Sequence, residues 1–521
     1  MQLFPRLRVL YIRGRSHCPR GGCLPISVSN HHRSTQGFSS AASRIRVSLL
    51  PPFFAALLFA LAPIRASADV GVILNESLDE SMDRITGTGH MAVYFSRICA
   101  ESPTKLRLCG PGESGSVMST YINIGEDHSY QWNIVPLSVY LYGVEDPFNR
   151  PIFASYKIKR ALEERYRQNY LAGLCDTTAC QTSGKSEWRE MVASTLIRGM
   201  YLFVVDTSVE QDRKLIDEFN NAPNENHFNG ATNNCADFAR RIVNTYFPHA
   251  ASRDVLNDFG MTSPKAVART FTHYALRHPK LNLRVMHFAQ VPGTIKRSSE
   301  VRAGTEQLFR SKKLLIPMAA FAYEALPVVA ASYVITGRFN PDKEFEKRPA
   351  TNLTPENLAS SPRLQPVALQ DQRAQIVGTS AEWKNYRKAL DTEIEENRDS
   401  PEARDPSHFF KLLDEKGTAS IGSDGAAWMQ LSDNGEAVSV GVSAGNVLAQ
   451  DSDPQLAYSL LLARTSVFLK SPKHRRETML EFRQDWANLQ RASAGAVSAS
   501  ARNAAPPKLA RLAPVQASGT F

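Results

Sequence analysis

The chain has 521 residues, 43% of them hydrophobic, and a formal net charge of +10. This length provides enough material for two to four domains with packed cores. The charge does not indicate a nucleic-acid-binding face, because residues 1–68 hold nine arginines and no Asp, Glu or Lys, and the rest of the chain carries only +1.

Residues 1–68 are typical of an export leader. An Arg-rich segment ends at Arg46, and residues 47–61 are apolar. The small residues Ala66-Ser67-Ala68 then precede Asp69, which fits signal-peptidase cleavage after Ala68. An uncleaved N-terminal anchor is the alternative. We expect an exported protein of the periplasm or cell envelope.

Five cysteines remain beyond this leader. Cys99 and Cys109 flank a turn-rich loop, and Cys175 and Cys180 bracket four residues. Two local disulfides would suit an oxidising compartment and would leave Cys235 as the unpaired thiol. A zinc site is the rival explanation, but the sequence has no second CxxC or His pair at ligand spacing, so we expect no metal.

Short strands and helices alternate between residues 69 and 310, which predicts one α+β domain. The expected strands are 70–74, 91–95, 117–124 and 200–205, and the expected helices are 152–170, 208–220 and a helix that begins at Cys235.

Four further segments follow this domain. Residues 311–336 are a hydrophobic helical segment, in which 314–336 is long enough to span a bilayer. Pro317, Glu324 and Pro327 lie inside it and favour a buried or interface-associated helix pair instead. The last three segments are an expected linker, an α-rich C-terminal region and a disordered tail, at 337–378, 379–490 and 491–521. Within 379–490, residues 426–442 are a β-like patch, with a hairpin expected around Asp433-Asn434-Gly435.

Cys235 opens an amphipathic helix. Positions 235, 238, 239, 242, 243 and 246 are apolar and fall on one helical face. Asn234 is a good N-cap, which places Cys235 in the first turn. Free N–H groups and the helix dipole there favour a thiolate and can hold an oxyanion. The competing interpretation is that Cys235 is a small buried hydrophobic residue.

His90 is the candidate proton acceptor for this thiol. It follows Gly87-Thr88-Gly89 and begins a strand, and an imidazole exchanges protons near neutral pH. A strand-edge histidine held in a hydrogen bond is the alternative. If 117–124 pairs antiparallel with 91–95, its end lies near His90, and Asn123 or His128 could orient the ring, with Asp127 a further candidate.

A His-initiated strand followed by an Asn-Cys helix start resembles the circularly permuted branch of the NlpC/P60 papain-like superfamily, which includes lecithin–retinol acyltransferase-like proteins. The segments GHMAVYF, YINIG, QWNIVPLSVYLYG and NNCADFARRIVN are most similar to domain of unknown function 4105, also called the Lnb N-terminal periplasmic domain. The resemblance covers about residues 85–250.

This resemblance implies an α+β, circularly permuted papain-like domain with an antiparallel sheet, beside a smaller, mainly helical C-terminal region. It implies Cys235 as nucleophile, His90 as base, and Asn123 or His128 as the third member. The two cysteine pairs and the long loop between Cys99 and Cys109 depart from the family pattern.

We therefore expect an exported cysteine hydrolase or acyltransferase that forms a thioester while acting on an amide or ester of a cell-wall peptide, lipid or lipoprotein. The sequence has no HExxH, P-loop or credible GxGxxG motif, so no cofactor, metal or nucleic-acid partner is expected. The alternative is a non-catalytic envelope binding or structural protein on the same fold, which docks on a membrane or partner through 314–336. A third hypothesis gives the function to the C-terminal region.

Overall fold

The computed structural model describes residues 67–78, 88–121, 130–171, 187–225, 227–310, 312–321, 323–348, 388, 413–433 and 436–448. The chain divides into two compact units, Met1–Ile64 and Arg65–Phe521, and every described residue belongs to the second. The apolar stretch of the leader and the C-terminal tail lie outside the described residues, so export and tail disorder stay predictions.

A six-stranded sheet carries the site, with strand order β6-β5-β2-β1-β7-β8. Every neighbouring pair in it is antiparallel, which confirms the expected α+β class with an antiparallel sheet. The strands are β1 Ser67–Asn75, β2 His90–Phe95, β5 Ser116–Ser119, β6 Asn133–Pro136, β7 Met200–Ser208 and β8 Arg284–Phe288.

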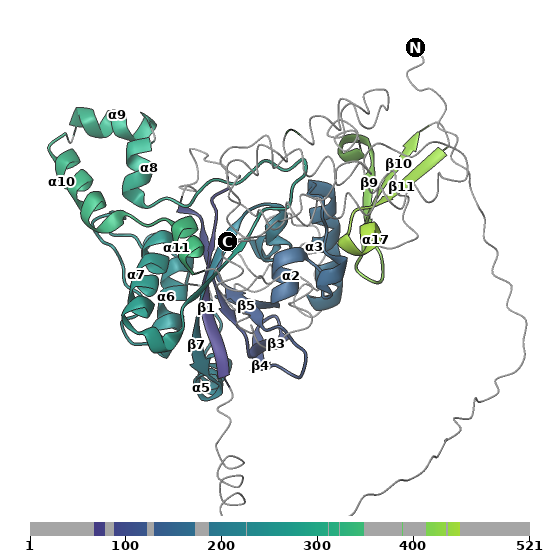
Figure 1. Ribbon diagram of the computed structural model, residues 1–521, viewed down its shortest axis with the longest axis horizontal. Helices are drawn as coiled ribbons and strands as arrows, with labels where there is room; N and C mark the ends of the chain where they lie inside the picture. Colours follow the sequence, from purple (N-terminus) through teal and green to yellow (C-terminus); the bar gives the residue numbers. More distant parts are fainter. Residues whose placement is uncertain are drawn as a thin grey trace, which may run out of the picture. The chain divides into compact units, whose positions relative to one another are not determined.

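Both faces of this sheet are buried, which explains why its strands are apolar almost without interruption. Along β2, Ala92 and Tyr94 enter one core, while Met91, Val93 and Phe95 enter the other. Helices cover each face (Figure 1). One face carries α2 Leu137–Tyr142 and α3 Tyr156–Tyr170, and the other carries α5 Val209–Asn221, α6 Cys235–Tyr246 and α7 Pro264–Arg277.

Side-chain caps set where the long helices begin. The Ser208 hydroxyl accepts from the Gln211 amide, and the Gln211 side chain accepts in return from the Ser208 amide, which completes a capping box at α5. At α3 and α7 the Ser155 and Ser263 hydroxyls are the caps, and each accepts from a backbone amide three residues later. The helix expected behind Ser208 is therefore confirmed.

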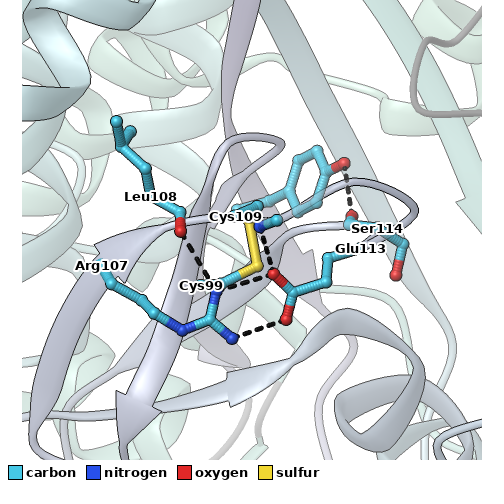
Figure 2. Close-up of a disulfide and its surroundings, with 8 residues drawn as sticks. Cys99, Arg107, Leu108, Cys109, Glu113 and Ser114 are labelled. Carbon is cyan, nitrogen blue, oxygen red and sulfur yellow. Dashed lines mark hydrogen bonds and ion pairs between the residues drawn. A yellow bond between two sulfur atoms is a disulfide. The ribbon is translucent and has the colours of Figure 1, made fainter.

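A disulfide joins Cys99 to Cys109 across the hairpin of β3, Ile98–Ser102, and β4, Lys105–Leu108 (Figure 2). Next to it the Arg107 guanidinium forms two hydrogen bonds of 2.7 Å with the Glu113 carboxylate. The first expected pair is therefore confirmed, while Cys175 and Cys180 lie outside the described residues.

The hydrophobic segment after the sheet breaks into short helices. They are α8 Gly304–Arg310, α9 Lys312–Phe321, α10 Ala325–Ser332, a π-helix over Tyr333–Gly337, and α11 Pro341–Lys347. Within the described ranges, we find no helix with the length and apolar character needed to cross a bilayer. Helix α11 lies inside the expected linker, 337–378, so the start of that segment is helical, with Asn340 as its cap.

The described part of the C-terminal region confirms the β-like patch expected at 426–442 and adds a strand before it. Three antiparallel strands, β9 Thr418–Ile421, β10 Ala427–Asp433 and β11 Glu436–Gly441, precede the short helix α17, Ala444–Leu448. The sheet packs on α3, and Met429 and Val440 enter the same core as that helix. Apolar and β-branched residues in 426–442 explain the strands. The remaining residues of 379–490 lie outside the described ranges.

Candidate active site

Cys235 is the first residue of α6 and is partly exposed. The Asn234 side chain caps this helix by accepting from the amides of Ala236, at 2.9 Å, and Asp237, at 3.0 Å. The same Asn234 donates to the carbonyl oxygens of Gly230 and Thr262. Both donors and both acceptor positions of the Asn234 side-chain amide are thus used to hold the helix start that presents the thiol.

The Asp237 carboxylate fixes the same turn from inside the protein. It is fully buried and accepts two hydrogen bonds from Arg253 and one, at 2.7 Å, from the Thr262 hydroxyl. A carboxylate in the first turn also complements the positive end of the helix dipole. The position of Cys235 is therefore set by charge pairing as well as by packing.

His90 is the first residue of β2 and is buried. Gly89 precedes it with φ +70°, and a Cβ at that position would lie 2.3 Å from the Asn75 carbonyl oxygen. Only glycine fits this approach without strain. The imidazole stacks on Tyr121 at a ring-centroid distance of 4.2 Å, and its Nε2 lies 2.7 Å from the Ser119 hydroxyl oxygen.

Cys235 and His90 line one pocket of about 1050 Å³. They meet there because α6 packs against β2 and both residues stand at the start of their element. Among the described residues no hydrogen bond joins the thiol to the ring. The structure thus brings the two predicted residues into one pocket.

Both groups are neutral at neutral pH. Burial lowers the pKa of His90 well below 6.5, and the nearby Arg198 lowers it further. Burial raises the pKa of the Cys235 thiol to about 11, although the backbone amides of Met91, Ala236 and Cys235, and the charge of Arg198, act in the opposite direction. The expectation that the helix start yields a thiolate is therefore wrong for the resting site, because desolvation outweighs the helix N-terminus.

Ser119 and Tyr121 are site residues that the sequence did not reveal. The register of β2 with β5 pairs Val93 with Met118 and Tyr94 with Val117, so continuing it brings Tyr121 opposite His90. The antiparallel pairing was expected, but its register was not, and the register decides which residue reaches the ring. Asn123, Asp127 and His128 lie outside the described residues, so their roles stay predictions.

Arg198 is a third residue that was missed. It is 3% exposed, lines the same pocket, and forms an ion pair with Glu190. The sequence feature that could have identified Arg198 is a cation two residues before Met200, where a buried strand begins. A charge at such a position needs a partner or a ligand.

One group of possible metal ligands lies close together among the described residues, outside this pocket. It consists of Cys99, Cys109 and Glu113, and the disulfide occupies both of its sulfur atoms.

Comparison with known proteins adds no family assignment. No protein-family model and no curated protein matches the chain. Among solved structures, a type VI secretion system effector, TseH, is similar, with a TM-score of 0.20, 11% identity, and coverage of 42% of this chain and 97% of that one. A likeness at this level carries no argument about fold or activity, so the resemblance to domain 4105 stays a prediction.

Proposed function

We propose that the protein is an exported cysteine hydrolase or acyltransferase on a circularly permuted papain-like domain. The observation that carries the proposal is that a thiol at a capped helix start and an imidazole at a strand start line one pocket. A nucleophile, a base and a position for the substrate carbonyl are the minimum for acyl transfer.

The tautomer of His90 follows from its neighbour. Ser119 lies 3.3 Å from the Met91 carbonyl oxygen, which can only accept, and 2.7 Å from Nε2 of His90. When the hydroxyl donates to that carbonyl, it accepts from Nε2–H, and Nδ1 is left with a free lone pair. Nδ1 is then the nitrogen that receives the thiol proton.

The reaction begins from a neutral pair. As the Cys235 sulfur attacks the substrate carbonyl, His90 takes its proton, and an S–C bond forms. The tetrahedral intermediate collapses, and the imidazolium gives that proton to the departing alcohol or amine, leaving a thioester. Water or an amine then attacks the thioester and restores the thiol.

The oxyanion of that intermediate needs a donor. Asn234 accepts from the amides of Ala236 and Asp237, so these are occupied. The Cys235 backbone N–H lies against its own sulfur, and it is the donor at the helix start that we assign to the oxyanion.

A thiol-reactive acyl probe tests this function. The mature protein is expected to be labelled at Cys235, with loss of labelling in Cys235→Ala and roughly a 100-fold slower reaction in His90→Ala, the scale of general base catalysis. Ser119→Ala is expected to act through His90 and to change the pH profile of labelling, while Ser119→Thr restores it. Equal labelling of wild type and His90→Ala would contradict the proposal.

A second candidate, a membrane-associated binding protein, is favoured by one surface. Apolar side chains on α9, α10 and the π-helix face solvent, and Ile335 is 79% exposed. The other exposed apolar side chains of this segment are Ile316, Val328 and Val334 on these helices and Tyr323 between α9 and α10. Such a patch is typical of interfacial contact. Flotation with anionic vesicles, weakened by Ile335→Asp, is the expected result, and flotation unchanged by that substitution would contradict it.

A further inference from the structure

The pocket that holds Cys235 and His90 has a cationic wall. The lining residues in the described part of the chain include six Lys or Arg and three Asp or Glu, a net charge of +3. The six are Lys159, Arg160, Arg189, Arg198, Lys296 and Arg297.

The three carboxylates of the pocket already have partners within the protein. Glu163 accepts from Lys159 at 2.6 Å, and Glu190 pairs with Arg198. Asp258 accepts from the Ser263 hydroxyl at 2.6 Å and from the Gly304 amide at 3.0 Å. These acids are therefore held in place, and the described lining keeps a formal excess of three positive charges.

Arg198 is the member of this wall whose charge acts on both reacting groups. Its positive charge influences the pKa of both His90 and Cys235. The side chain is buried, and its Nε atom is enclosed without a hydrogen-bond partner among the described residues. A buried guanidinium with an unused donor is costly unless a ligand satisfies it.

We infer that this wall, centred on Arg198, is an oxyanion-binding subsite that holds a phosphate or carboxylate group of the acyl substrate beside Cys235. A guanidinium matches either group through paired N–H donors. Arg160, an exposed residue of α3 with no ion pair to any described residue, adds long-range attraction at the pocket wall. The inference rests on the proposed function for the identity of the substrate, but its test needs only the thiol.

Two alkylating agents of nearly equal size provide the test. Iodoacetate is an anion and iodoacetamide is neutral, and with each the Cys235 sulfur forms an S–C bond while iodide leaves. Both react with the same thiolate, so the ratio of their rate constants does not depend on thiolate abundance. The rates are measured on the full chain by site-resolved mass spectrometry, with the uncharged N-acetylcysteine amide as the reference thiol.

The iodoacetate-to-iodoacetamide ratio at Cys235 is expected to be roughly tenfold higher than for N-acetylcysteine amide, the effect of one charge-assisted hydrogen bond. Arg198→Gln should return it to the reference ratio, and Arg198→Lys should keep part of the preference. Should Arg198→Gln not fold, Arg160→Gln on the exposed surface is expected to lower the ratio by about twofold.

Protection of Cys235 by inorganic phosphate more than by acetate indicates a phosphate group, and the reverse order indicates a carboxylate.

A wild-type ratio no higher than that of N-acetylcysteine amide would overturn the inference, whatever the variants do. His90→Ala separates this result from failure of the proposed function, because His90 is neutral and should not set the ratio. One outcome would refute the catalytic proposal but support the anion subsite. In it, the iodoacetate-to-iodoacetamide ratio stays raised in His90→Ala, while acyl labelling of Cys235 does not depend on His90.

Discussion

The pH dependence of Cys235 alkylation distinguishes a neutral site from a preformed ion pair. The perturbation is a series of pH values from 6 to 11, applied to wild type and His90→Ala. Burial holds the thiol pKa at about 11, against an ordinary 9.0. His90 cannot store the proton as a stable imidazolium, because burial and Arg198 lower its own pKa.

The size of the effect follows from the shift of the thiol. Two pKa units correspond to about 100-fold less thiolate than an unperturbed cysteine has, and at pH 7 the thiolate fraction is about 10⁻⁴. The alkylation rate should therefore rise about tenfold for each pH unit and level off only near pH 11.

The assay is the rate of iodoacetamide incorporation at the peptide that contains Cys235, with N-acetylcysteine as reference and circular dichroism to check the fold at each pH. Cys235→Ala gives the background. Wild type and His90→Ala should show the same slope, because a neutral imidazole does not stabilise the thiolate. A wild-type rate that is already constant between pH 6 and 8 would refute the reasoning, since it would require a thiolate–imidazolium pair at rest.

Two further predictions concern stability. Burial raises the pKa of Asp212, which accepts from the Tyr246 hydroxyl at 2.7 Å, to about 7. The contribution of Asp212 to the free energy of unfolding is therefore fully present below about pH 3.8 and is lost as the pH rises through 7, on the order of 4 kcal/mol in total. Urea unfolding from pH 4 to 8 should show this loss in wild type and not in Asp212→Asn, and the same pH dependence in both proteins would contradict it. The Cys99–Cys109 disulfide closes a loop of ten residues, so the double Ala variant should lose about 3 kcal/mol of unfolding free energy; an unchanged urea midpoint under oxidising conditions would contradict this.

Local patterns predicted the parts of the site that depend on neighbours in sequence. Asn234 before an apolar helical face predicted where α6 begins, and Ser208 as a cap predicted the start of α5. A cap and its helix are a few residues apart, so their chemistry is visible in the sequence. The same holds for Cys99 and Cys109, which are close enough to pair across one hairpin.

Residues joined by the fold could not be predicted in that way. Ser119 reaches His90 only because of the register between β2 and β5, and a shift of one residue would bring the opposite face to the ring. The β-like patch at 426–442 predicted β10 and β11, whereas β9 was not expected, since a strand of four residues has weak periodicity.

The sequence by itself determined the nucleophile candidate, the base candidate and their order, because each is marked by a cap, a glycine or a cysteine count within a few residues. The tertiary structure alone decided their charge states and their surroundings. Burial raises the pKa of the Cys235 thiol and lowers that of His90, and Arg198 approaches both from the start of another strand. Desolvation and long-range charge depend on what the folded chain packs around a group, and no local pattern records that.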